Sequence, residues 1–290
     1  MRRFSNSWAM AVASWRVLQS DKELMAIPVM SFFATAATTI LSGGAIYFSL
    51  DHRAAVPAGQ SAYAATPLTY AVGAVAYLLI TFVVTFFAAA LVAGARERLL
   101  GGNPTLGSAF AVAYSRLGPI FLWSLLTGTV GLVLNAIQNR AGIFGQLIVR
   151  AVGMAWQIVT WLAVPVIVVE GTGPITSLKR SAGLFKQTWG ENLIGQVGFG
   201  IIGLLFMLPG LVIAGLLLVH FPLVGIFVGV AWVAIVSVVT STLSGIFRTA
   251  LYHFASGQPV PAEFDHAQLA GAFQTRKGRG RGASVDGRLS

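Results

Sequence analysis

Runs of apolar residues, each long enough for a membrane span, dominate the pattern of hydrophobic and polar positions along the chain. A helix needs about 20 such residues to cross the hydrocarbon layer. The runs lack the alternation typical of membrane β-strands, and an unpaired backbone is costly in lipid, so they predict helices. The six predicted spans are 25–50, 67–94, 117–138, 143–169, 193–219 and 223–247.

Three shorter segments place apolar residues on one helical face and polar residues on the other. They cover residues 1–24, 104–116 and 174–187, and each precedes a predicted span. The second is expected to start at Asn103 as N-cap with Pro104 after it. The third is expected to start at Pro174, with an apolar face formed by Ile175, Leu178, Ala182 and Phe185.

These elements define the predicted fold class, which is all-α. The chain is expected to be a polytopic membrane helix bundle with six transmembrane helices and three amphipathic helices on the cytoplasmic side. Residues 1–24 form the first amphipathic helix, residues 25–250 the transmembrane domain, and residues 251–290 a cytoplasmic tail. From about residue 270 the tail is Gly-rich and basic, which predicts disorder.

Composition supports the same class of protein. Hydrophobic residues make up 56% of the chain and charged residues 10%, which excludes a soluble enzyme. The chain has no Cys and only four scattered His, so we expect no metal site, no cofactor and no catalytic residue. The net charge of +10 is spread between the apolar runs rather than gathered on one polar domain, so no nucleic-acid partner is expected.

The positions of Lys and Arg predict the orientation, because cytoplasmic loops carry the excess of these residues. Of the 19 Lys and Arg residues, only Arg53 and Arg140 fall in the loops predicted to be external, and Arg150 falls within a span. Both termini are therefore expected in the cytoplasm. The resulting location is the cytoplasmic (inner) membrane of a prokaryote, since a high Arg-to-Lys ratio with abundant Ala, Gly and Val is typical of a GC-rich bacterial genome.

Several short motifs resemble a family of six-helix prokaryotic integral membrane proteins whose domain has no known function. They are Ala-Ser-Trp-Arg-Val-Leu at 13–18, Asp-Lys-Glu-Leu at 21–24, Gly-Gly-Asn-Pro-Thr at 101–105, Val-Glu-Gly at 169–171, Lys-Arg-Ser at 179–181, Thr-Trp-Gly-Glu at 188–191 and Ala-Leu-Tyr at 250–252. The resemblance covers residues 5 to 265. It implies the same helical architecture and carries over no activity, substrate or catalytic residue.

Two groups of side chains are candidate binding sites. Basic residues of the amphipathic segments are expected at headgroup depth, where anionic phospholipids would bind. They are Arg16, Arg116, Lys179, Arg180 and Lys186. Within the fourth span, Arg150 and Gln157 form a candidate intramembrane polar site, although Arg150 lies close enough to the outer end to extend its charge into the headgroups instead.

A third group is a candidate ion-pair cluster at the cytoplasmic surface, formed by Glu170, Glu191, Arg96 and Arg98. A structural role at the ends of the fourth and fifth spans and a substrate or ion site both remain open for it. Pro209-Gly210 is expected to break or kink the fifth span, and such breaks also occur at transporter binding sites.

Three functional hypotheses follow. The first is a non-enzymatic integral membrane protein that acts as a scaffold, binds a membrane-protein partner or organises lipid. The alternative is a small-solute or lipid permease that uses Arg150, Gln157 and the Pro209 break. The third is an intramembrane lipid-modifying enzyme, which the sequence supports least because no nucleophile, base or metal-ligand set gathers at one depth. The oligomeric state does not follow from the sequence.

Overall fold

The computed structural model describes residues 14, 23–50, 65–189 and 197–258. All regular secondary structure in this part of the chain is helical, which confirms the predicted all-helical class. The helices are α2 (Glu23–Ser49), α3 (Pro67–Leu99), α4 (Leu106–Ser115), α5 (Leu117–Arg140), α6 (Ile143–Thr160), α7 (Ala163–Glu170), α8 (Pro174–Trp189), α9 (Val197–His220) and α10 (Pro222–Ala255). The predicted first amphipathic helix and most of the basic tail lie outside these residues.

Five segments of the described chain are long and apolar enough to cross a membrane. They are α2, α3, α5, the pair α6–α7 and α10. The remaining predicted span, the fifth, at residues 193–219, corresponds to α9, and its first predicted residues lie outside the described part of the chain. In α9 the stretch Leu204–His220 is apolar but shorter than the other five.

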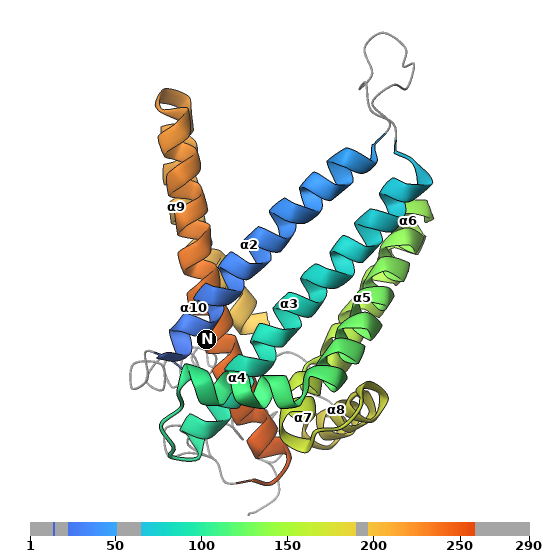
Figure 1. Ribbon diagram of the computed structural model, residues 1–290, viewed down its shortest axis with the longest axis vertical. Helices are drawn as coiled ribbons and strands as arrows, with labels where there is room; N and C mark the ends of the chain where they lie inside the picture. Colours follow the sequence, from blue (N-terminus) through green and yellow to red (C-terminus); the bar gives the residue numbers. More distant parts are fainter. Residues whose placement is uncertain (1–13, 15–22, 51–64, 190–196, 259–290) are drawn as a thin grey trace, which may run out of the picture.

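The long helices run between two ends of the molecule (Figure 1). One end, which we call the basic end, holds the last turns of α3, α7 and α10 together with the short helices α4 and α8. The opposite end holds the α2–α3, α5–α6 and α9–α10 connections. At that opposite end the hydroxyls of Thr66 and Thr69 both donate to the carbonyl oxygen of Ser49, at 3.1 and 2.7 Å, which ties the start of α3 to the end of α2.

The core lies mainly at the basic end, around the second half of α3. Small residues of α3, Ala89, Ala90 and Ala95, are fully buried and let neighbouring helices approach closely. Packed around them are Leu24 and Ile27 of α2, Ala109 and Ala113 of α4, Ile120 and Trp123 of α5, Val166 and Ile167 of α7, and Ile246 and Leu251 of α10. The outer halves of the long helices instead expose apolar side chains, as expected for helices that face lipid.

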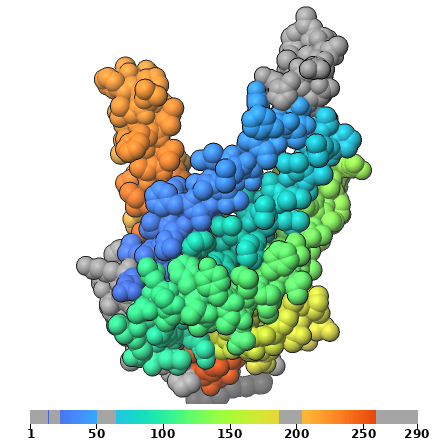
Figure 2. Space-filling model, in the orientation of Figure 1, coloured from blue at the N-terminus to red at the C-terminus, as the bar shows by residue number. Residues whose placement is uncertain are grey.

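The hairpin of α9 and α10 diverges from α2 toward the opposite end (Figure 1), and the space-filling view shows a V-shaped opening between them (Figure 2). The two helices of the hairpin approach closely at Gly225, where an added Cβ would lie 2.6 Å from the backbone nitrogen of Leu218. Farther along the hairpin, the indole nitrogen of Trp232 donates to the carbonyl oxygen of Phe206 at 3.0 Å. Helix α9 continues through Pro209, so the chain does not break there, and the predicted kink stays a prediction.

The interruption occurs in the fourth predicted span instead, at Trp161 and Leu162 between α6 and α7. Pro165 lies in the first turn of α7 and has no N–H, so it cannot donate to the carbonyl of Trp161 as a helix would require. The Ser181 hydroxyl of α8 stabilises the break. It donates to the carbonyl oxygen of Val159 at 2.5 Å and accepts from the backbone N–H of Leu162 at 3.2 Å.

Two further boundaries differ from the prediction. Helix α4 begins at Leu106 with Thr105 as N-cap, not at Asn103, because Thr105 and Ser108 form a reciprocal capping box. Helix α10 continues to Ala255, beyond the predicted end at Phe247, because its last turns are buried in the core rather than exposed to water.

Candidate functional site at the basic end

Most of the described Lys and Arg residues gather at the basic end. Helices α3, α8 and α10 and the α4–α5 junction supply them, namely Arg96, Arg98, Arg116, Lys179, Arg180, Lys186 and Arg248. In the part of the chain that the structure describes, the remaining two are Arg140, in the last turn of α5 at the opposite end, and Arg150 in α6. The positive charge of the described residues is therefore concentrated at one end of the molecule, and the candidate site lies there.

Helix α8 separates its polar and buried sides clearly. Ser177, Ser181 and Leu184 are buried, whereas Lys179 and Lys186 are exposed. Ile175, predicted on the apolar face, is 53% exposed, since the serines at 177 and 181 occupy the buried side and bind backbone groups at the Thr172–Gly173 turn and the α6–α7 break. The two lysines are thus free to meet a negatively charged surface.

Glu170, at the end of α7, links three helices. Its Oε1 atom accepts a hydrogen bond from Nε of Arg180 on α8 at 3.1 Å and another from the hydroxyl of Tyr252 on α10 at 2.9 Å. The prediction grouped Glu170 with Arg96 and Arg98, but its ion pair in the described residues is with Arg180, because α7 and α8 fold back on each other. Glu191 lies outside the described residues.

The predicted partners of Glu170 have other surroundings. Arg98 donates through Nη1 to the carbonyl oxygen of Gly102 at 3.4 Å. Arg96 lies within electrostatic range of the Tyr252 hydroxyl, and its Nε atom is buried without a hydrogen bond among the described residues. The Ser108 hydroxyl donates to Glu97 at 2.7 Å, so this carboxylate between the two arginines is directed toward α4.

Arg116, at the junction of α4 and α5, packs against the backbone of Gly171. Gly171 ends α7 in the left-handed conformation, with φ of 68°, which favours glycine. A Cβ at this position would lie 2.7 Å from Cζ of Arg116, so the guanidinium occupies the space that a side chain would need. The Nε atom of Arg116 is also buried and forms no hydrogen bond within the described chain.

Arg248 of α10 lies next to the break in the fourth predicted span. Its guanidinium carbon is 4.4 Å from the centre of the Trp161 ring, a cation–π geometry. A cation here also complements the carbonyl groups at the end of α6. The sequence pattern predicts no role for Arg248 or Tyr252, yet both belong to this packed end. The break could have been predicted from Pro165, which cannot donate a hydrogen bond to the carbonyl of Trp161.

The other predicted groups are not brought together. Arg150 and Gln157 are both exposed on α6, so the structure does not place this predicted polar site in an internal cavity. Of the predicted lipid contacts, Arg16 lies outside the described residues and Arg180 is paired with Glu170. Within the described residues, no group of three or more His, Cys, Asp or Glu could hold a metal ion.

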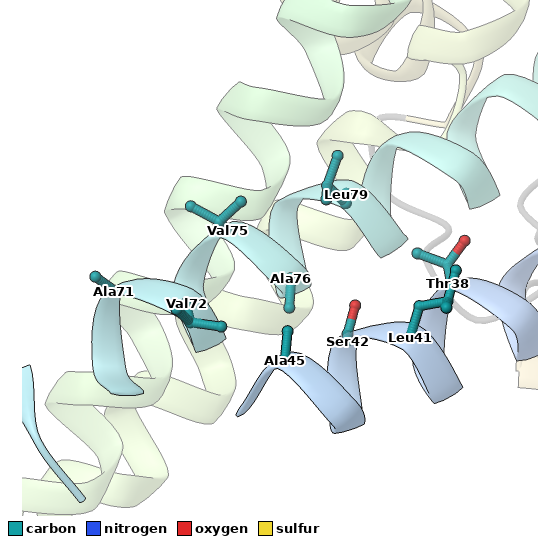
Figure 3. Close-up of a pocket in the computed structure, with 9 residues that line it drawn as sticks. All are labelled: Thr38, Leu41, Ser42, Ala45, Ala71, Val72, Val75, Ala76 and Leu79. Carbon is teal, nitrogen blue, oxygen red and sulfur yellow. The ribbon is translucent and has the colours of Figure 1, made fainter. Parts of the chain in front are cut away.

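A separate pocket of about 450 Å³ lies between α2 and α3 in the half of the bundle away from the basic end (Figure 3). Its wall is apolar except for two hydroxyls, and none of the predicted site residues contributes to it. The lining residues are Thr38, Leu41, Ser42, Ala45, Ala71, Val72, Val75, Ala76 and Leu79. Ala45 and Ala76 point toward each other across the gap between the helices (Figure 3).

Taken together, the long apolar helices and the lipid-like exposure of their outer halves define an all-helical protein of the multi-pass membrane class. The chain belongs to a family of unknown function, DUF6159, whose model matches residues 68–260. No curated protein and no solved structure matches the chain.

Proposed function

We propose that this protein is a non-enzymatic, six-span protein of a prokaryotic cytoplasmic membrane that binds anionic phospholipids at its basic end. Lipid organisation is its primary role in this proposal, and a membrane-protein partner would use the same charged surface. The observation that carries the proposal is the gathering of basic side chains, two of them exposed lysines of α8, at one end of a bundle of apolar helices.

The same asymmetry supports the proposed orientation. Arg and Lys are enriched in cytoplasmic loops, so the basic end is assigned to the cytoplasm and both termini with it. In this arrangement α9 is the fifth span, which carries the chain across the membrane before α10 returns it as the sixth. The basic end then lies at the depth of the anionic headgroups, where each nearby Lys or Arg contributes about 1 kcal/mol of attraction.

Retention of lipid by the purified protein tests the proposal. We expect the double variant Lys179→Gln and Lys186→Gln to retain less phosphatidylglycerol than wild type in native mass spectrometry, with zwitterionic phosphatidylcholine unaffected. Arg180 is left unchanged, because its pairing with Glu170 would confuse loss of lipid binding with loss of folding. Arg140→Gln, which removes a charge at the opposite end, is the matched control. Equal phosphatidylglycerol retention by all three proteins would contradict the proposal.

A second candidate function is a small-solute or lipid permease. The break between α6 and α7 favours it, because discontinuous helices form binding sites in many transporters. A screen for solutes that raise the melting temperature would test this function. We expect a true substrate to stabilise wild type and the Arg150→Gln variant but not Arg248→Lys, since Arg248 lies beside the break and Arg150 is exposed on α6. A screen without any stabilising solute class would count against a permease.

A further inference from the structure

Among the described residues, three arginines at the basic end, Arg96, Arg116 and Arg248, have Nε atoms that are buried without a hydrogen bond. The guanidinium of Arg248 stacks on the Trp161 ring, which leaves Arg96 and Arg116. Arg96 lies one turn before the end of α3, and Arg116 forms the junction between α4 and α5. Buried donors in native proteins are nearly always paired, and those of arginine are especially costly to leave alone because the group is charged. Both residues keep part of their surface exposed, so a ligand can reach them.

The two side chains flank the same turn at the end of α7. Arg116 packs against Gly171, and Arg96 lies within electrostatic range of Tyr252, which donates to the adjacent Glu170. Three arginines thus lie near this turn: Arg180 binds Glu170 directly, Arg116 lies against Gly171, and Arg96 acts electrostatically on Tyr252. Arg180 and Tyr252 both bind the same oxygen of Glu170, so its charge is already compensated.

The positive charge that remains at this turn is therefore carried by Arg96 and Arg116. Both residues stand at ends of long apolar helices, which is the level of the lipid headgroups in the orientation proposed above. A guanidinium presents several donors in a planar fork that matches the oxygens of a phosphate group. A phosphate at headgroup depth is therefore the ligand whose charge, geometry and location fit these two side chains.

We propose that Arg96 and Arg116 form a binding site for the phosphate group of an anionic phospholipid beside the Glu170–Gly171 turn. This site rests on the proposed function. It is more specific than the general attraction of anionic lipid, because the exposed lysines of α8 attract any anionic surface, whereas these two guanidinium groups bind one headgroup. Gly171 contributes by lacking a side chain, which allows Arg116 to lie against the backbone.

The experiment compares lipid retention by native mass spectrometry from an equimolar mixture of phosphatidylglycerol and phosphatidylcholine. In the double variant Arg96→Gln and Arg116→Gln, we expect phosphatidylglycerol retention to fall by at least about fivefold, the effect of losing one headgroup cation, while phosphatidylcholine retention is unchanged. Arg140→Gln should behave as wild type. Unchanged phosphatidylglycerol retention by a folded double variant overturns the site.

A purely structural role of Arg116 at the C-terminal end of α7 is distinguished by Arg116→Lys. Lysine keeps the charge that complements the helix end but loses the planar fork. We expect a melting temperature equal to that of wild type together with reduced phosphatidylglycerol retention. Equal retention by Arg116→Lys and wild type would assign Arg116 to the helix end alone and overturn its place in the site. This single variant also decides the matter if the double variant does not fold.

A free phosphate ion shares the chemistry of the headgroup, so inorganic phosphate is tested separately. We expect it to raise the melting temperature of the detergent-purified protein less than phosphatidylglycerol does. If inorganic phosphate raises the melting temperature as much as phosphatidylglycerol does, and the double variant Arg96→Gln and Arg116→Gln abolishes that rise, the assignment to lipid is overturned.

The lysine and arginine variants separate this site from the proposed function. If Lys179→Gln and Lys186→Gln reduce lipid retention but the arginine variants do not, the site fails and the proposed function stands. If neither pair has an effect, both fail.

Discussion

Replacing Gly225 by alanine should separate the α9–α10 hairpin. An added Cβ would lie 2.6 Å from the backbone nitrogen of Leu218 and 2.9 Å from the carbonyl oxygen of Ala214. Ordinary contacts of a Cβ atom begin at 3.4 Å, so the two helices must move apart by about 0.8 Å. Backbone atoms cannot rotate away as the end of a flexible side chain can. The substitution therefore acts on the whole hairpin.

Two opposing effects set the change in the free energy of unfolding that Gly225→Ala causes. Overpacking of a close contact costs about 1–3 kcal/mol, whereas alanine in place of glycine favours the helix by about 1 kcal/mol. Gly215 of α9 supplies the control, because no atom of the described residues lies within 4 Å of the place where its Cβ would stand. The propensity term is shared by Gly225→Ala and Gly215→Ala and cancels in their comparison. We expect the difference in their free energies of unfolding to be about 1–3 kcal/mol, with Gly225→Ala the less stable.

The measurement is reversible unfolding of each purified variant in mixed micelles with increasing fractions of sodium dodecyl sulfate. Separation of the helices should also weaken the hydrogen bond from Trp232 to Phe206, which spans the same pair of helices. Indole fluorescence of Trp232, isolated by replacing the other tryptophans, reports this change in the folded state. Equal stability of the two glycine variants would refute the close approach of α9 and α10 at Gly225.

Three further outcomes can be checked on the same preparation. Ser181→Ala should lower the free energy of unfolding by about 1–3 kcal/mol, because it leaves backbone groups at the α6–α7 break without partners, whereas Ser115→Ala on the exposed side of α4 should have little effect. A double-mutant cycle of Glu170→Gln and Tyr252→Phe should show a coupling energy of about 1.5–3 kcal/mol, typical of a hydrogen bond to a charged group, and additive effects would show that the bond contributes nothing. Reporter fusions after Gly102 and Ser256 should report the cytoplasm and a fusion after Ala141 the outside, and a shared location for all three would contradict the topology.

The pattern of apolar and charged residues is enough to predict the class of the protein and the course of its long helices. Both follow from local properties, since the thickness of the hydrocarbon layer dictates the length of an apolar run and lipid forces the backbone to bond within it. Helices α2, α3 and α5 accordingly fall close to the predicted spans. The capping box of Thr105 and Ser108 is equally local, so the sequence around it could have predicted the start of α4 at Leu106 rather than after Asn103.

The contacts between polar groups, in contrast, depend on how the helices pack in three dimensions. Glu170 lies at the end of a predicted span, but its contact with Tyr252 joins residues 82 positions apart, and no periodicity or spacing specifies such a pair. The same holds for Ser181, whose hydroxyl serves the α6–α7 break, and for Arg116, whose guanidinium lies against Gly171. Apolar helices in lipid can pack in many arrangements, and small residues and hydrogen bonds between helices stabilise one arrangement over the others. The contacts at the basic end therefore depend on this packing arrangement, which the hydrophobic pattern does not specify.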